Sequence, residues 1–346
     1  MLYPDPILSA NVYAAGSLDE ILRRALRPFR TAVHERCPDS KAYLWTMRYG
    51  CGGEHLKIRL HGPEGENAAL REELGDAVER ALAGLDATPD LEARPPTPPI
   101  DAEDLEGPHA DRSWCWTTYR RSHLSLGSKP FLLDDGYVAR FTRSLGAACE
   151  VALEALVPEA DGAVPHMVRH DTLTRLVLDG LAALGFDDSQ RRDYLYFHRD
   201  WLIRFPLLKS DGTLAKAREI AVHFEQIRDD MAAELETLGH LARSEWEKAD
   251  IDADPWRRAL ADLWSYTAPL CEDPAFHVDP FAALPMFTPV FKVFHCAANQ
   301  LGLSWFEEAV VHHLLVRAAA PAEPVRLDVL FEPEARELEE FASYEC

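Results

Sequence analysis

The stretch that most constrains the fold of this chain is residues 43–62, Y-L-W-T-M-R-Y-G-C-G-G-E-H-L-K-I-R-L-H-G. Two arms of alternating apolar and polar residues flank a glycine-rich segment, and such alternation is typical of strands with one buried face. Gly50, Gly52 and Gly53 supply the backbone freedom that a tight turn between the arms requires. The stretch therefore predicts an antiparallel hairpin.

The second arm of the hairpin predicts a cationic strand face. Its apolar residues fall at even positions, and its odd positions are expected to project outward as His55, Lys57, Arg59 and His61. Arg48 of the first arm alternates out of phase with its aromatic neighbours, so pairing is expected to bring it beside Lys57 and Arg59. On a chain with a formal charge of -22, such a face indicates an anion site, for a phosphate, an acidic metabolite or the carboxylates of a peptide, which the arginine fork binds well.

Composition excludes several classes of partner. The chain has 346 residues, enough for one large core or two ordinary ones. Its negative charge repels phosphate backbones, and no stretch combines clustered Lys and Arg with aromatic residues, so nucleic acid is not expected as a partner. The first residues lack the pattern of a signal peptide, and no apolar segment reaches membrane-spanning length. We therefore expect a cytoplasmic protein without a membrane partner.

Cofactor motifs are absent from the sequence. The seven cysteines follow no C-x-x-C spacing, which predicts free thiols in a reducing compartment. The 14 histidines form no H-E-x-x-H pattern, and His312 and His313 of a predicted helix diverge by about 100°. Neither a G-x-G-x-x-G nor a G-x-x-x-x-G-K-[ST] stretch occurs. The expectation is a protein with no metal and no organic cofactor.

Strand signals gather in the first third of the chain. Besides the two hairpin arms, strands are predicted over 7–13 and 113–121. A helix is predicted from a cap at Ser17, with Glu20 completing a capping box, to a point before Cys37. A second helix is predicted over 64–85. Prolines and acidic residues over 86–111 predict a solvated loop.

Helical signals dominate the remainder. Apolar stripes at helical spacing predict helices from about Leu132, over 173–184, 214–246, 256–264, 291–301 and 304–318, and from Glu332. Because strands come early and helices late, the predicted fold class is α+β. Residues 1–125 are expected to form an α/β sandwich with an antiparallel or mixed sheet, and residues 126–346 a mainly helical part.

Motifs near both ends of the chain resemble one known family. Arg48-Tyr49 precedes the H-L-K-I-R-L-H-G run of residues 55–62, a strand centred on Tyr119 follows, and H-C-A-A-N-Q-L-G lies at 295–302. In order and spacing these stretches resemble the R-Y…H-L-R-L-R-x-x-G and H-M-x-x-N-R-L motifs in the elimination domain of lantibiotic dehydratases. The resemblance covers nearly the whole chain and implies a single elimination-domain-like unit over 1–346. It places Lys57 and Arg59 on the family's basic strand.

This sequence departs from that family after the strand at Tyr119. The family's domain removes glutamate from glutamylated Ser or Thr in a ribosomally made peptide, and it carries a P-E-x-E-R-Y-G-G type of run at this point. Here the run is Y-R-R-S-H-L-S-L-G, with Ser125 where an arginine is expected and no acidic residues. This loss argues against glutamate elimination. The segment S-H-L-S-L-G-S-K-P-F-L resembles instead the thiopeptide pyridine synthases, which share the fold.

The second resemblance implies a cofactor-independent enzyme that acts on a leader-bearing precursor peptide containing thiazoles and dehydroalanines. Pyridine synthases join two dehydroalanines by a formal aza-[4+2] cycloaddition and expel water and the leader peptide, which leaves a pyridine-centred macrocycle. This chemistry needs positioning of two alkenes, hydrogen bonds to an imidic tautomer and proton transfer to two leaving groups. A glutamate lyase of a split dehydratase and a non-catalytic leader-binding scaffold are the alternatives. The oligomeric state is open between a monomer and a homodimer.

Hydroxyl and imidazole groups suit these tasks, so the candidate catalytic residues are His295, Ser265, Tyr266, Ser122, Ser125 and Tyr119. His295 is the expected proton-transfer group because imidazole titrates near neutral pH. The candidate substrate-binding residues are Arg48, His55, Lys57, Arg59, His123, Asn299, Asp273 and His277. Structural alternatives stand beside these roles: a core position for His295, backbone capping or orientation of His295 for Asn299, and a plain connecting loop for 265–279.

Overall fold

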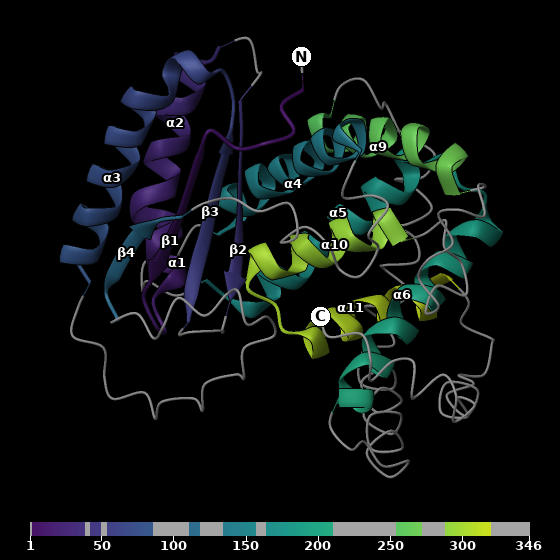
Figure 1. Cartoon of the computed structure of the whole chain (residues 1–346). Coiled ribbons are helices and arrows are strands. Elements are labelled where there is room, and N and C mark those ends of the chain that lie inside the picture. Colours follow the sequence, from purple (N-terminus) through teal and green to yellow (C-terminus); the bar gives the residue numbers. More distant parts are fainter. Residues whose placement is uncertain are drawn as a thin grey trace. The chain divides into compact units, whose positions relative to one another are not determined.

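The computed structural model describes residues 2–38, 42–49, 54–85, 111–117, 134–156, 164–209, 254–271 and 288–319. The chain divides into two compact units. The first unit contains Met1–Arg169 and Asn299–Gly302, and the second contains His170–Ala298 and the residues from Leu303. The elements of both units are labelled in Figure 1. The prediction of one elimination-domain-like unit stays a prediction.

The first unit is built on a four-stranded antiparallel sheet with the strand order β2-β3-β1-β4. The strands are β1 (Leu8–Tyr13), β2 (Tyr43–Tyr49), β3 (His55–His61) and β4 (Ser113–Trp116). β1 lies between β3 and β4. β4 follows α3 in the chain and adds to the sheet beside β1. The predicted hairpin strands and the first strand are confirmed, and the predicted 113–121 strand is confirmed over Ser113–Trp116.

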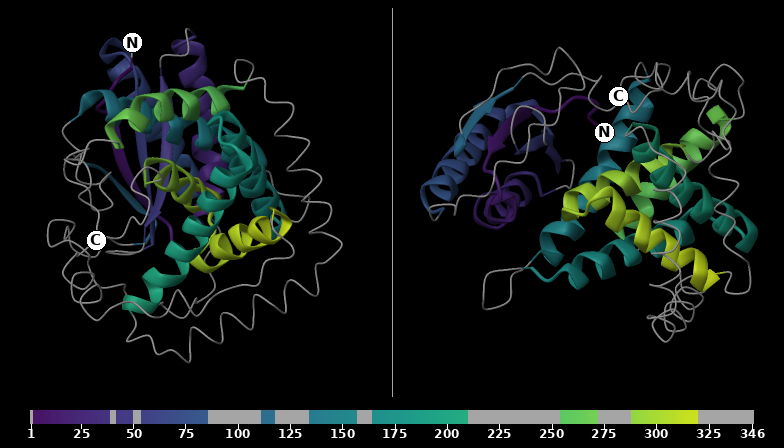
Figure 2. Two further views of the ribbon diagram at one scale, coloured as in Figure 1. Left: turned by 90° about the vertical axis from the view of Figure 1, so that its right-hand side faces the viewer. Right: turned by 90° about the horizontal axis from the view of Figure 1, so that it is seen from below.

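Helices cover the sheet face that carries Leu56 and Ile58. The helices of this unit are α1 (Leu18–Ile21), a π-helical segment at Leu22–Leu26, α2 (Arg27–Arg36), a 3₁₀ turn at Glu64–Glu66, α3 (Asn67–Ala83) and α4 (Asp135–Ala155). α2 and α3 lie side by side (Figure 2). α3 reaches β4 at Gly75, and α4 reaches β2 where Cys149 meets Thr46.

The predicted apolar stripes form the core of this unit. Leu70, Leu74 and Val78 of α3 are fully buried, as are the stripe residues of α4. Asp134 caps α4 by accepting hydrogen bonds from the backbone N–H groups of its first turn. The capping box predicted at Ser17 is wrong, because Glu20 pairs with Arg23 and Arg24 instead of the backbone.

The strand register overturns one prediction about the hairpin. Arg48 pairs with Leu56, whereas Met47 pairs with Lys57 and Trp45 with Arg59. Residues opposite one another in an antiparallel pair share a face, so Arg48 lies on the face opposite Lys57 and Arg59. A shift of the pairing by one residue would have reversed the two faces, and sequence alternation does not fix that shift.

His61 is fully buried, and both of its ring nitrogens lie within hydrogen-bonding distance of a partner. Trp45 donates its Nε1–H to Nε2 of His61 (3.0 Å), and the opposite ring nitrogen, Nδ1, contacts the carbonyl oxygen of Tyr3 (3.2 Å). The Trp45 donor leaves no room for a proton on Nε2. Burial lowers the pKa of His61 to about 3.

The burial of His61 predicts a loss of stability in acid. The pKa is lower in the folded state than the ordinary 6.5, so stability is fully present above pH 6.5 and falls as the pH drops towards 3. His61→Gln keeps a donor and an acceptor but does not titrate. We expect this variant to remove about 1.4 kcal/mol per pH unit from the slope of unfolding free energy between pH 6 and pH 4. Urea unfolding measures the slope, and identical slopes in both proteins would contradict the assignment.

The second unit is helical in its described residues. It is made from α5 (His166–Ala183), α6 (Asp188–Lys209), α9 (Pro255–Cys271), α10 (Thr288–Leu301) and α11 (Trp305–Ala319), with the first turn of α5 and the last residues of α10 belonging to the first unit. Its core combines the α5 stripe with Trp256, whose indole N–H donates to the carbonyl of Leu176. Among the helices that the structure describes, none is long and apolar enough to cross a membrane.

α6 was not predicted from the sequence. Its apolar pattern is weak, but a capping box marks its start: Asp187 accepts from the backbone of Gln190, and Gln190 accepts from the backbone of Asp187. The helix lies along α11. The predicted helix over 214–246, the acidic loop and the C-terminal helix lie outside the described residues.

Candidate active site

His295 is paired with a buried carboxylate in the second unit. Its Nδ1 lies 2.7 Å from Oε2 of Glu308, with His295 on α10 and Glu308 one turn into α11. The Glu308 side chain is 1% exposed, whereas that of His295 is 12% exposed. His295 is therefore the member of the pair that can meet a substrate.

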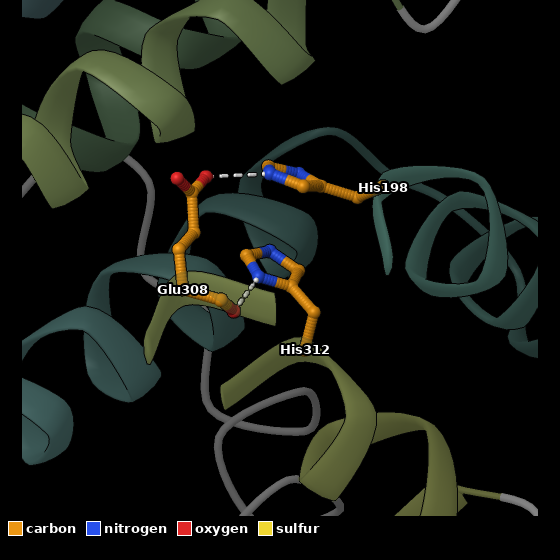
Figure 3. Close-up of side chains that lie close together, drawn as sticks. All are labelled: His198, Glu308 and His312. Atoms are coloured by element: carbon orange, nitrogen blue, oxygen red, sulfur yellow. Dashed lines mark hydrogen bonds and ion pairs between the residues drawn. The ribbon is translucent and has the colours of Figure 1, made fainter. Parts of the chain in front are cut away.

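A second histidine holds the other oxygen of the same carboxylate. Nε2 of His198, on α6, lies 2.8 Å from Oε1 of Glu308, and Nδ1 of His198 lies 2.7 Å from the hydroxyl of Tyr194. Tyr194 and His198 are both fully buried. Figure 3 shows the carboxylate of Glu308 turned towards His198, with the ring of His312 next to that of His198. Four side chains from three helices thus form one hydrogen-bonded series.

The charges of this series follow from burial and hydrogen bonding. Burial alone would raise the pKa of Glu308, but His295 and the hydrogen bonds from His198 and His295 outweigh it and lower the pKa to about 2. Burial lowers the pKa of His198 in spite of its bond to the carboxylate. Burial, with the nearby carboxylate, raises the pKa of Tyr194 well above its ordinary value. At neutral pH Glu308 is ionised, and His198 and Tyr194 are neutral.

His312 completes the cluster without carrying charge. Its Nδ1 bonds to the backbone carbonyl of Glu308 (3.0 Å), and its ring stacks on that of His198 with centroids 3.6 Å apart. Burial lowers the pKa of His312 to about 3, and the neighbouring imidazole of His198 acts in the same direction. Of the three imidazoles around Glu308, His198 and His312 are thus kept neutral. The carboxylate of Glu308 raises the pKa of both rings, but burial outweighs that effect.

One nitrogen each from His198 and His312 and one oxygen of Glu308 lie within 4.8 Å of one another, close enough to suggest a metal site. The stacking argues against it. The two rings are stacked with their centroids 3.6 Å apart and are tilted by only 20°, so their lone pairs lie in two separate, nearly parallel planes. A metal about 2.0–2.1 Å from both nitrogens would lie far out of both ring planes. The arrangement fits shared protons better than a shared metal ion.

Aromatic rings surround the imidazole of His295. Phe291 lies parallel to it at 5.9 Å between centroids, and Trp305 lies at 4.4 Å. Trp201 of α6 stacks on Trp305 at 5.4 Å. Apolar walls of this kind limit water around the pair, so the hydrogen bond between Glu308 and His295 is stronger than it would be in solvent.

The structure places Ser265 and Tyr266 differently from the prediction of a loop. Both residues lie within α9, which continues to Cys271 in spite of Pro269. The hydroxyl of Ser265 donates back to the carbonyl of Asp262, and that of Thr267 to Leu263, which are ordinary helical contacts. The loop assignment over 265–271 is wrong, while the catalytic roles of Ser265 and Tyr266 stay predictions.

Asn299 uses both ends of its side-chain amide on the backbone of Arg48. Oδ1 accepts from the Arg48 N–H (2.7 Å), and Nδ2 donates to the Arg48 carbonyl (3.0 Å). The Arg48 guanidinium pairs with Asp19 and reaches the carbonyl of Gln300. Of the two structural roles considered for Asn299, the geometry supports backbone capping. The substrate-binding roles of Arg48 and Asn299 stay predictions.

The basic face of β3 is buried, which contradicts the expected outward projection. Lys57 is 7% exposed and lies over the ring of Tyr49, with Nζ 3.7 Å from the centroid. Arg59 is 2% exposed and donates to the carbonyls of Ala10 and Ile58. His55 packs against Tyr13 and Tyr49. This face is therefore buried in the folded chain, and its role in holding a peptide stays a prediction.

Six predicted site residues lie outside the described residues: Tyr119, Ser122, His123, Ser125, Asp273 and His277. Conversely, the sequence reasoning missed Glu308, His198 and Tyr194. Two local signals were present, since Tyr194 and His198 are four residues apart on one helix face, as are Glu308 and His312. Neither spacing indicates that the two pairs meet. Among the cysteines with described side chains, Cys37, Cys149 and Cys296 are free thiols, as predicted.

The fold defines the class of protein that this chain resembles: it is the α+β fold of lantibiotic dehydratase-like enzymes, which confirms the predicted fold class and the resemblance at the level of fold. No protein-family model matches the chain, and no curated protein matches its sequence.

Three solved structures carry the comparison. TbtD, a pyridine synthase from thiomuracin biosynthesis, matches with a TM-score of 0.59 and 18% identity over 91% of this chain and 98% of its own. TsrL matches with a TM-score of 0.53 and 15% identity over 98% of this chain and 99% of its own. The tRNA-dependent lantibiotic dehydratase MibB from Microbispora sp. 107891 matches with a TM-score of 0.51 and 15% identity, over 90% of this chain and 27% of MibB.

Proposed function

We propose that this chain is a pyridine synthase of thiopeptide biosynthesis. Its substrate is a leader-bearing precursor peptide with thiazoles and two dehydroalanines, and its product is the pyridine-centred macrocycle. One observation carries the proposal: partly exposed His295 is backed by the buried carboxylate of Glu308, in a fold that the pyridine synthase TbtD also has. The resemblance of the motifs at 48–62 and 295–302 supports it.

The proposed reaction balances without an oxidant. One dehydroalanine and the imidic tautomer of its amide form a 2-azadiene, and the alkene of the other dehydroalanine adds across its ends with two new C–C bonds. The ring then holds one double bond. Loss of water from the former amide carbonyl creates the second, and loss of the leader peptide as an amide creates the third, which makes the ring aromatic. Each loss moves a proton from the ring to a leaving group.

His295 is the proposed carrier of these protons. Glu308 accepts the Nδ1–H of His295, so Nε2 of the neutral ring is free to act as a base. Once Nε2 has taken a ring proton, the ionised carboxylate stabilises the imidazolium, which can then act as the acid for the leaving group. Bringing the two alkenes together contributes the larger part of the acceleration, since positioning alone is worth about 7–11 kcal/mol.

The direct test is incubation of the purified protein with a dehydrated thiazolyl peptide that carries its leader, followed by mass spectrometry. The expected result is loss of water and release of the leader as an amide, with His295→Ala and Tyr266→Phe slowing turnover in a folded protein. An unchanged peptide mass under conditions of demonstrated binding would contradict the proposal and favour a non-catalytic scaffold.

Glutamate elimination is the second candidate function, because the chain also shares its fold with the lantibiotic dehydratase MibB. The same assay with a glutamylated peptide separates the two activities, because a lyase releases glutamate and leaves the leader attached. Ser125, where the family carries an arginine, makes this outcome the less expected one.

A further inference from the structure

The side chains behind His295 admit only one assignment of their protons at neutral pH. Ionised Glu308 is acceptor-only, so both its histidine partners must donate to it. His198 therefore carries its proton on Nε2. Because His198 is neutral, its Nδ1 is a lone pair, and the hydroxyl of Tyr194 must be the donor in that contact. Every hydrogen bond in the series points towards the carboxylate.

The position of this series is also fixed. Tyr194 packs against Phe294 of α10 with ring centroids 5.7 Å apart, and it meets His198 edge to face at the same separation. His198 is held on its other side by the stacked ring of His312. Because His198 is fully buried and packed on both sides, it holds the carboxylate of Glu308 in one orientation towards His295.

From this arrangement we propose that Tyr194 and His198 are positioning residues that, acting through Glu308, fix His295 with its proton on Nδ1 and its Nε2 as the reacting atom. The inference deepens the proposed function, because it assigns the groups that prepare the proton carrier of that reaction. Neither Tyr194 nor His198 touches the substrate, since both are fully buried.

A matched pair of variants at His198 tests the proposal in the activity assay. His198→Gln retains an N–H at the place of Nε2 and can still donate to Glu308, whereas His198→Leu removes the donor. We expect His198→Leu to lower kcat about 10- to 100-fold with little change in KM, and His198→Gln to restore most of the loss. The acid limb of the rate profile moves to higher pH in His198→Leu, because a carboxylate with one donor fewer holds the imidazolium proton more tightly. Equal rates and profiles in both variants would overturn the proposal.

A second measurement separates this inference from the proposed function. In the free protein the proton between His295 and Glu308 is expected to give a low-field ¹H NMR resonance that is coupled to Nδ1. We expect this resonance to be absent in His295→Gln. It moves in His198→Leu and returns in His198→Gln. If no peptide is converted but the resonance behaves in this way, the positioning stands and the reaction fails. If the resonance is insensitive to His198→Leu, the positioning fails whatever the reaction.

Tyr194→Phe keeps the test decisive should His198→Leu not fold. It removes one hydroxyl and retains the ring that packs on Phe294. The His198 Nδ1 lone pair is then left buried without its donor, so the same resonance is expected to broaden or move. An unchanged resonance and an unchanged rate profile in folded Tyr194→Phe would overturn the role of Tyr194.

Discussion

Glu308→Gln is expected to lower kcat for peptide cyclisation by about 10²- to 10⁴-fold. The amide of glutamine offers one acceptor and one donor in place of two acceptors. With the Tyr194 hydroxyl donating to Nδ1 as in the wild type, His198 keeps its Nε2–H and therefore takes the amide oxygen. The amide NH₂ then faces Nδ1 of His295. The neutral ring of His295 is forced to carry its proton on Nε2, so it cannot act as a base there.

The neighbouring residue offers a matched control. Glu307 accepts a hydrogen bond from the backbone N–H of Ser304 at the start of α11, and glutamine can do the same. Glu307→Gln is therefore expected to retain the wild-type kcat. Circular dichroism on both variants checks that the fold is intact. Equal turnover in folded Glu308→Gln and Glu307→Gln would contradict the role of the buried carboxylate.

Gly302→Ala is expected to destabilise the protein by about 2–5 kcal/mol. Gly302 follows α10 with φ +77, where an L side chain is strained, and its N–H bonds to the carbonyl of Asn299. A Cβ at this position would lie 2.6 Å from Nη1 of Arg169 and 2.7 Å from Cζ of Arg48. Both guanidiniums are held by Asp19 and by carbonyls at the end of α10, so they cannot step aside at low cost.

Gly185→Ala separates the two causes of this loss. Gly185 has nearly the same backbone conformation, with φ +69, but nothing lies within 4 Å of the position of its Cβ. We expect a cost of about 1–2 kcal/mol from the backbone alone. Urea unfolding of both variants gives the difference, which reports the clash with the arginine pair. Equal losses at the two glycines would show that Arg48 and Arg169 move without penalty.

Local alternation was sufficient to predict the hairpin and the order of strands before helices. Strand and helix periods are properties of neighbouring residues, and the buried stripes at Leu70 and Phe141 lie where they were expected. α6 was not predicted because its polar residues obscure the helical period of its apolar residues. Its capping box is the local signal for the start of the helix. The face of Arg48 was predicted wrongly because register depends on which residue meets which across the turn.

His295 could be singled out from the sequence because a short motif carries it. The partners of His295 could not be predicted, because they lie far from it in the sequence. Glu308 is 13 residues from His295, and His198 is 110 residues from Glu308. On a single helix the adjacent residues His312 and His313 point in directions that differ by about 100°, so the sequence alone indicates no shared site. It could not anticipate that α6 would bring His198 against one member of the pair.

The sequence alone therefore determined the fold class, the hairpin, most of the described helices and the one histidine that the motif carries. Tertiary structure decided that both faces of β3 are buried, what Arg48 binds and which carboxylate lies beside His295. The physical reason is that periodicity and capping act over a few residues along the chain. Protonation states and hydrogen-bond directions depend on burial and on contacts between α6, α10 and α11, which only packing brings together.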